Sequence, residues 1–183
     1  MSPVRGGVVA ACALAAAVAL AGCADPAPPG QLPDGGATST PSTSAGTASA
    51  EGAEAQILTD YLAYWDGVIL AHRMANPAQP ELARHATGAE LTKVRGAVTR
   101  NRLQHISIRG DVRHQPTVQS AAGAAAVVED CYDVSEWDPV DTRTGKPIAA
   151  VEQGGTGRYR ARFTLRRAAG GWMVVSSSTL GAC

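Results

Sequence analysis

The sequence predicts an α+β fold for residues 51–183, with helices packed on a four-stranded antiparallel sheet. In the first part of this segment, apolar residues recur at three- and four-residue spacing, which is typical of an amphipathic helix. After residue 105 the apolar and polar residues alternate, as in strands with one solvated face. Helices that precede strands, instead of alternating with them, indicate the α+β class.

A long first helix is predicted over residues 51–75. Glu51 and Glu54 are expected in its first turn, where carboxylates interact favourably with the helix dipole. Asn76 and Pro77 predict its end. Its apolar stripe contains Ile57, Leu58, Tyr61, Leu62, Trp65, Val68, Ile69 and His72.

Two further helical segments follow. A short turn is predicted over residues 80–85, with Pro80 at its start. Thr87 and Glu90 have the spacing of a capping box, in which each side chain bonds the other residue's backbone N–H. A third helix is therefore expected from there to about Leu103.

Four strands are predicted next. The first covers residues 106–115, and the second covers residues 124–134. The third follows Gly154 and Gly155, and in it Tyr159, Ala161, Phe163 and Leu165 alternate with arginines. A hairpin turn at residues 169–171 leads to the fourth strand, over residues 172–180.

The N-terminus has the pattern of an export signal. One arginine, Arg5, precedes an uncharged, mostly apolar segment over residues 6–22. The end of that segment, Leu20-Ala21-Gly22-Cys23, is similar to the lipobox of bacterial lipoprotein signal peptides. That resemblance implies cleavage after Gly22, lipidation of Cys23, and a location at the outer face of the cytoplasmic membrane, in the cell envelope. An uncleaved signal anchor is the alternative.

Residues 23–50 are predicted to be a disordered tether. Leu32 is the one large apolar side chain among Ala, Pro, Gly, Ser and Thr, so the segment cannot bury enough surface to offset the entropy of ordering. The segment would hold the domain at residues 51–183 away from the membrane. O-glycans on its Ser and Thr side chains are a further alternative.

Two cysteines lie in the expected domain. Cys12 leaves with the signal and Cys23 takes the lipid, so Cys131 and Cys183 are left. In an exported protein such a pair indicates a disulfide. A nucleophile or metal ligand is a weaker alternative, because no Cys-x-x-Cys or His pairing accompanies either residue.

The order of elements resembles the nuclear transport factor 2-like, cystatin-like cone fold, in which a long first helix crosses a curved antiparallel sheet. More narrowly, residues 51–183 resemble a group of actinobacterial secreted lipoproteins of that fold. The residues that carry this resemblance are Tyr61, Tyr64-Trp65, Leu82-Ala83-Arg84-His85-Ala86-Thr87-Gly88, Arg109-Gly110, Asp130-Cys131-Tyr132-Asp133, Thr144-Gly145, Gly170-Gly171-Trp172 and Cys183. The group has no assigned activity.

Several functions are disfavoured. The formal net charge is +0 and the pI is about 6.9, which argues against nucleic acid as a partner and against a polybasic membrane patch. No metalloprotease, nucleophile-elbow, Walker or dinucleotide motif occurs. The four His residues have no metal-ligand spacing, and neither a metal nor a cofactor is expected.

Cone folds often hold a pocket between the first helix and the sheet. Enzymes of this class, such as polyketide cyclases and ketosteroid isomerases, use a carboxylate there to move a proton beside a carbonyl. The candidate pocket residues are Tyr61, Tyr64, Trp65, His72 and Asp133. The structural alternative places the aromatics in the core and pairs Asp130 and Asp133 with arginines of the third strand. No catalytic residue is assigned.

Alternation also places Arg158, Arg160, Arg162 and Arg166 on one side of the third strand. A solvated face partly neutralised by Asp111 is one interpretation, and a docking surface for an anionic envelope polymer or protein is the other. The favoured function is a non-enzymatic module that binds a small ligand or an envelope protein, and the alternative is a small acid–base enzyme. Pairing of two chains through their open sheet faces is a further expectation.

Overall fold

A computed structural model describes residues 44–149 and 157–183. The predicted signal, the predicted lipobox residues Leu20, Ala21 and Gly22, and the predicted lipidation site Cys23 lie outside these residues. The helices are α1 (Ser44–Arg73), α2 (Pro80–His85) and α3 (Gly88–Leu103). The strands are β1 (Ile106–Arg109), β2 (Pro116–Ala122), β3 (Ala125–Asp133), β4 (Asp138–Asp141), β5 (Arg158–Ala168) and β6 (Gly171–Ala182).

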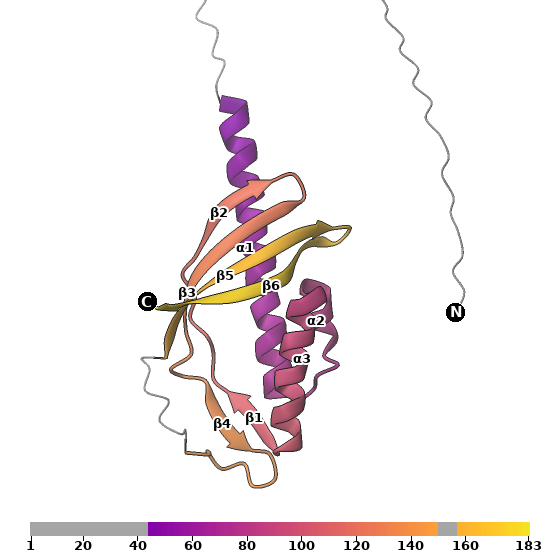
Figure 1. Cartoon of the computed structure of the whole chain (residues 1–183), viewed down its shortest axis with the longest axis vertical. Helices are drawn as coiled ribbons and strands as arrows, with labels where there is room; N and C mark the ends of the chain where they lie inside the picture. The colour runs from indigo at the N-terminus through magenta and orange to yellow at the C-terminus, as the bar shows by residue number, and fades with distance from the viewer. Residues whose placement is uncertain (1–43, 150–156) are drawn as a thin grey trace, which may run out of the picture. The chain divides into compact units, whose positions relative to one another are not determined.

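The predicted α+β architecture is confirmed. Four antiparallel strands form one sheet in the order β2-β3-β5-β6, and α1 and α3 pack against it (Figure 1). The pairing register shifts within β2–β3 and twice within β5–β6. Such bulges bend a strand and increase its twist, so they curve the sheet around the helices.

The helix α1 begins earlier than predicted, at Ser44 rather than at residue 51. The expectation that the tether extends to residue 50 is therefore wrong for residues 44–50, and the first turn contains no acidic residue. Alanine is frequent in this segment and has the highest helix propensity. Once the packed part of α1 has nucleated, extending the helix toward the N-terminus costs little free energy, because each added residue also adds a hydrogen bond.

The prediction of the first strand is partly wrong. Only residues 106–109 form a strand, β1, and it pairs with the unpredicted β4 in a separate two-stranded sheet. Gly110 ends β1 with a φ of 90°, and a Cβ at this position would overlap the carbonyl oxygen of Glu136. One of the two outer strands of the main sheet is β2, which was not predicted because its sequence has no apolar alternation.

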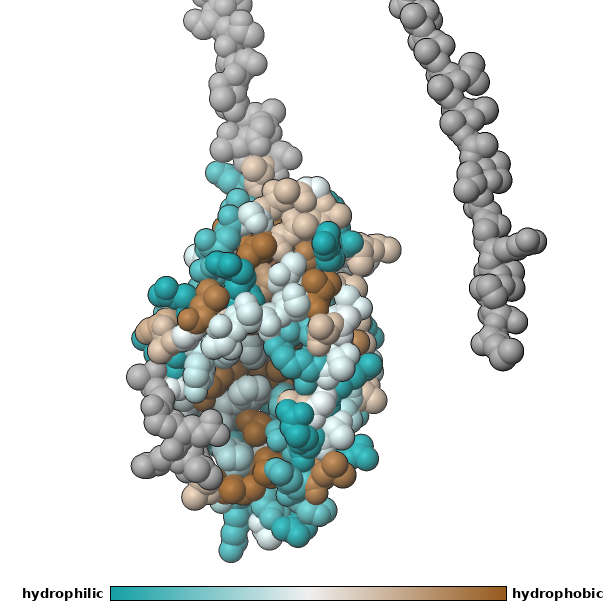
Figure 2. All heavy atoms as spheres, in the orientation of Figure 1, coloured by the Kyte–Doolittle hydropathy of each residue, from teal (hydrophilic) through white to brown (hydrophobic). Residues whose placement is uncertain are grey.

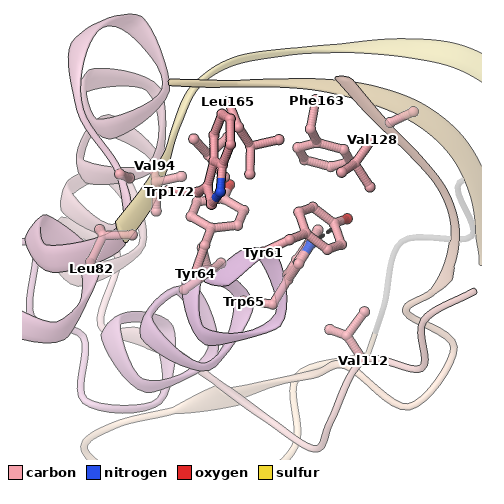
Figure 3. Close-up of a cluster of buried hydrophobic side chains, with 14 of the residues drawn as sticks. Tyr61, Tyr64, Trp65, Leu82, Val94, Val112, Val128, Phe163, Leu165 and Trp172 are labelled. Carbon is pink, nitrogen blue, oxygen red and sulfur yellow. Dashed lines mark hydrogen bonds between the residues drawn. The ribbon is translucent and has the colours of Figure 1, made fainter. Parts of the chain in front are cut away.

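The core lies between α1 and the concave arrangement of β3, β5 and β6. Tyr61, Tyr64 and Trp65 point from α1 toward Phe163 and the sheet (Figure 3). On the other side of α1, the backbone of α2 approaches so closely that only glycine fits at position 67. These contacts hold α1 between the sheet and α2. The labelled members of the cluster are Tyr61, Tyr64, Trp65, Leu82, Val94, Val112, Val128, Phe163, Leu165 and Trp172.

Candidate functional site: an aromatic cavity between the helices and the sheet

A cavity of about 270 Å³ lies between α1, α3 and the strands β3, β5 and β6. The helix α1 contributes four lining residues, because Tyr64, Val68 and His72 recur on one face and Trp65 lies beside them. The helix α3 contributes Glu90, Lys93, Val94 and Ala97. The face of the molecule in Figure 2 has a hollow with apolar side chains inside it.

Aromatic residues are concentrated around the cavity, where they are six of the sixteen lining residues. The sequence contains three Trp, four Tyr and one Phe. All of them line the cavity except Tyr61 and Trp172. A chain with so few aromatic residues therefore places most of them around one space. These residues are Tyr64, Trp65, Tyr132, Trp137, Tyr159 and Phe163.

A polar cluster occupies the side of the cavity between α3 and β6. The buried Glu90 carboxylate accepts a hydrogen bond of 2.6 Å from the Tyr64 hydroxyl. The Lys93 ammonium lies 2.8 Å from the same Glu90 oxygen and also donates to the Ser177 hydroxyl. Burial is the main cause that raises the pKa of Tyr64, and the nearby Glu90 charge is the second. Tyr64 therefore stays protonated and acts as a donor.

His72 lines another part of the cavity as a neutral imidazole. Burial lowers its pKa to about 4, because the charged form would lose its hydration. Its Nδ1 lies 3.3 Å from the Asn101 amide nitrogen, and its ring packs edge-on against Trp137. At neutral pH, His72 therefore adds hydrogen-bonding capacity to the wall without adding charge.

The structure brings together three of the five predicted pocket residues, Tyr64, Trp65 and His72. Tyr61 lies in the core instead, where it is fully buried. Asp133 is not among the lining residues. It faces outward, where hydrogen bonds from the Ser135 side chain and backbone, together with Arg113, lower its pKa to about 2.

The carboxylate of the cavity is Glu90, which sequence reasoning assigned to a capping box. That assignment is wrong, because Thr87 makes no side-chain cap and Glu90 turns inward to Tyr64. The sequence spacing did contain a signal for the inward position of Glu90. Glu90 precedes Val94 by four residues and Ala97 by seven, so the three share the inward face of α3.

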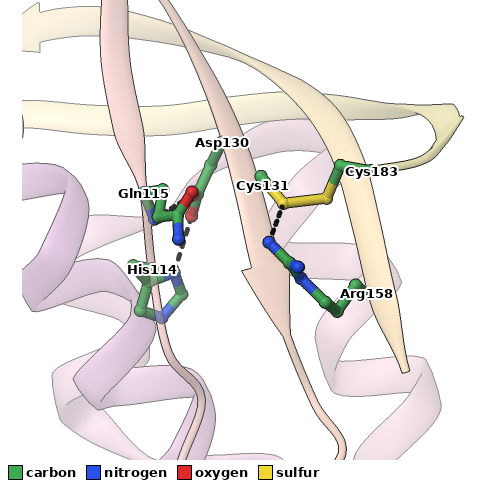
Figure 4. Close-up of a disulfide and its surroundings, with 6 residues drawn as sticks. All are labelled: His114, Gln115, Asp130, Cys131, Arg158 and Cys183. Atoms are coloured by element: carbon green, nitrogen blue, oxygen red, sulfur yellow. Dashed lines mark hydrogen bonds and ion pairs between the residues drawn. A yellow bond between two sulfur atoms is a disulfide. The ribbon is translucent and has the colours of Figure 1, made fainter. Parts of the chain in front are cut away.

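Asp130 anchors a second polar network behind the cavity wall. Its buried carboxylate accepts hydrogen bonds from His114 Nδ1 at 2.6 Å and the Gln115 backbone N–H at 2.7 Å (Figure 4). It also accepts one from the Tyr61 hydroxyl at 2.8 Å. The Trp65 indole N–H donates to the Tyr61 oxygen at 2.7 Å. The expected pairing of Asp130 and Asp133 with arginines of the third predicted strand is therefore wrong.

The predicted disulfide between Cys131 and Cys183 is confirmed, with a Cα–Cα distance of 6.0 Å. It joins β3 to the residue that follows β6, and these two strands flank β5 in the sheet. The Arg158 guanidinium donates to Cys131 Sγ at 3.4 Å (Figure 4).

Four of the five arginines of β5 lie on the face of the sheet opposite the core, since the residues that alternate with them face inward. They are the predicted Arg158, Arg160, Arg162 and Arg166. Glu129 on β3 binds Arg162 at 2.6 Å. Asp111 instead pairs with Arg73 on α1, so its expected role in neutralising this face is wrong. Arg160 is exposed, and Arg166 lies near the β5–β6 turn.

Within residues 44–149 and 157–183, no group of three or more His, Cys, Asp or Glu residues is arranged to hold a metal ion. None of the helices described there combines the length and hydropathy that crossing a bilayer requires.

Comparisons with known proteins give distant structural likeness. No family model and no curated protein matches the sequence. The intermembrane-space region of the chloroplast protein ARC6 is similar over 70% of this chain and 97% of its own, with 14% identity and a TM-score of 0.47. A proposed aromatic ring hydroxylase from Novosphingobium aromaticivorans is similar over 70% of this chain and 88% of its own, with 13% identity and a TM-score of 0.46.

Proposed function

We propose that this chain is a lipid-anchored protein of the cell envelope whose folded domain binds a small, mostly apolar ligand. The observation that carries this proposal is the concentration of aromatic side chains around one cavity. Ligand sites are concave and mainly apolar, with a few polar groups that orient the bound molecule. The cavity has this composition, with Glu90, Lys93, Ser177 and His72 as its polar groups.

The size of the cavity limits the ligand. Sites for drug-sized molecules enclose about 300–1,000 Å³, and an engineered apolar cavity of about 150 Å³ binds benzene. A volume of about 270 Å³ lies between these values. It fits a molecule of one ring, or of two small rings.

Acid–base catalysis is the weaker alternative. Such chemistry needs a carboxylate whose pKa is matched to proton transfer, which burial in an apolar site provides. Among the described residues that line the cavity, Glu90 is the only carboxylate, and it is bound to Lys93 and Tyr64. The Lys93 ammonium at 2.8 Å and the Tyr64 hydroxyl at 2.6 Å both contact the same Glu90 oxygen, so that oxygen is not free to exchange a proton with a substrate.

The membrane anchor is supported by the sequence at residues 1–23. Small residues before Cys23 and the apolar segment preceding them are what lipidation and signal cleavage require. Stable anchoring needs two acyl chains or an equivalent second signal. A diacylglyceryl group on Cys23 meets this requirement, and it would hold the domain at the outer face of the cytoplasmic membrane.

Native mass spectrometry of the full chain, purified from membranes, tests the ligand proposal. We expect a reproducible extra small-molecule mass. Ala97→Leu on α3 fills the cavity and should abolish that mass. The matched control is Ala55→Leu on the exposed part of α1, which should retain it. A bare mass in the wild type, with no small molecule raising its thermal stability, contradicts the proposal.

A further inference from the structure

We propose that the cavity selects an uncharged ring compound with an acceptor oxygen, such as an aromatic ketone, over the matching carboxylate. This inference rests on the proposed ligand-binding function and names the class of ligand. It is carried by the polar cluster of Glu90, Lys93 and Ser177 and by the rings that surround it.

Lys93 provides the donor for the acceptor oxygen. An ammonium has three N–H donors. Its two partners are Glu90 and the Ser177 hydroxyl, so one of the three donors is left over, and Lys93 is a lining residue of the cavity. The Lys93 side chain is 58% exposed, so this donor is accessible. Thr179 lies two residues after Ser177 on β6 and also lines the cavity, which adds a second hydroxyl from the same strand.

Glu90 makes the site unfavourable for an anion. Its carboxylate is 2% exposed and binds the Lys93 ammonium from inside the wall. Among the described lining residues, these two are the ones charged at neutral pH, because His72 is neutral. A bound carboxylate would meet an ammonium whose charge is already balanced and would lie near a second carboxylate. Placing like charges together in this way is costly.

The walls favour a flat ring as the body of the ligand. Trp65, Tyr132 and Phe163 present aromatic surface to the same space. Offset and edge-to-face contacts between rings add to the free energy gained by apolar burial. A ring that packs there with its oxygen toward Lys93 would use both parts of the site.

Three ring compounds of similar size test the inference: cumene, acetophenone and benzoate. Dissociation constants are measured by ligand-observed NMR with the full chain in detergent, against a detergent-only blank. Acetophenone is expected to bind more tightly than cumene and at least about tenfold more tightly than benzoate. Lys93→Met should remove the advantage of acetophenone over cumene. Arg95→Met, which removes an exposed charge from the same helix away from the cavity, should preserve it.

Glu90→Gln provides the sharper test, because it leaves the Lys93 charge unbalanced. We expect benzoate to gain at least about tenfold in affinity while acetophenone changes little. If Glu90→Gln does not fold, the inference is still tested by comparing Lys93→Met with Arg95→Met. Only Lys93→Met should lose the advantage of acetophenone over cumene. A wild type that binds benzoate as tightly as acetophenone overturns this inference and leaves the proposed function intact. A wild type that binds none of the three contradicts both.

Discussion

The Asp130 carboxylate is a buried charge that three hydrogen-bond donors hold in place. Burial raises the pKa of Tyr61, so its hydroxyl remains a donor to Asp130. Asp130→Asn would turn an amide N–H toward one of these donors. We expect it to lower the free energy of unfolding by about 2–4 kcal/mol, as measured by urea denaturation.

The matched control is Asp111→Asn, which removes the charge of an exposed aspartate that is paired with Arg73. Exposed ion pairs contribute roughly 0–1 kcal/mol, so this variant should be nearly neutral. Equal effects of the two substitutions would contradict the structural role assigned to Asp130.

His72 makes stability depend on pH. Its pKa is about 4 in the folded state, against about 6.5 in an unfolded chain. Between these values the unfolded chain binds a proton that the folded chain does not, so stability falls as pH is lowered from 6.5 to 4. The expected loss is about 2–3 kcal/mol. Urea denaturation at pH 7.5 and pH 4.5 measures it.

The variant His72→Gln has no imidazole to protonate, so it should lose this part of the pH dependence. Other groups that titrate in the same range affect both proteins alike. If the wild type and His72→Gln lose the same stability between the two pH values, His72 is not the buried neutral group described above.

At the scale of single residues, periodicity correctly predicted that Tyr61 and Trp65 on α1 face inward, but the predicted stripe left out Tyr64, which is also buried. It did not predict their partners: Tyr61 binds Asp130 in the core, and Tyr64 binds Glu90 at the cavity. Asp133 and Glu90 were misplaced for a related reason. The contacts of Asp133 with Arg113 and of Glu90 with Tyr64 join residues far apart in sequence. Local spacing contains no information about such partners.

At the scale of elements, Gly67 sets how closely α1 and α2 approach. A Cβ at this position would lie 2.9 Å from the backbone Cα and N of Leu82, and backbone cannot move aside as a flexible side chain can. Overpacking of this kind costs about 1–3 kcal/mol. The higher helix propensity of alanine offsets about 1 kcal/mol of this cost. We therefore expect Gly67→Ala to destabilise the domain by up to about 2 kcal/mol in urea denaturation.

Gly52 offers a control in the same helix. A Cβ there meets nothing within 4 Å, so Gly52→Ala should stabilise the protein by up to about 1 kcal/mol. If both substitutions stabilise, then α2 does not pack on α1 as closely as described.

The disulfide ties β3 to the end of β6 and closes a segment of 52 residues. In the chain-entropy model, a loop of this size contributes about 4 kcal/mol by restricting the unfolded chain. A reductant should therefore lower the unfolding midpoint, and hydrogen exchange should accelerate first at the C-terminal end of β6. The double variant Cys131→Ser, Cys183→Ser should be equally destabilised and insensitive to reductant. A midpoint that reductant leaves unchanged contradicts the bridge.

The strands show where sequence patterns determine structure and where they do not. The strands β3 and β5 alternate between buried and more exposed residues, as does the first part of β6, because each buries one face on the core, and all three were predicted. The strand β2 lies at an edge of the sheet and has no buried residue, so its sequence contains no apolar alternation that predicts a strand. The alternation that continues past Arg109 reflects Val112 and His114 facing inward from an extended segment that is not a strand.

At the scale of the whole molecule, the cavity and the disulfide belong to one folded unit, which the structure describes over residues 44–149 and 157–183. The formal net charge of the chain is +0, which argues against a polybasic patch that attracts an anionic membrane. The proposed function assigns membrane attachment to one atom, the Cys23 sulfur, which makes membrane retention separable from folding and from ligand binding.

This separation predicts the outcome of Cys23→Ser. Without the thiol there is no diacylglyceryl group, and we expect the processed, membrane-retained form to disappear from fractionated cells. Cys12→Ser is the matched control, because Cys12 lies in the expected signal and should leave with it. That variant should give a retained product with the mass of the lipidated wild type. If Cys23→Ser leaves fractionation and mass unchanged, residues 1–22 act as an uncleaved anchor and the lipid assignment fails.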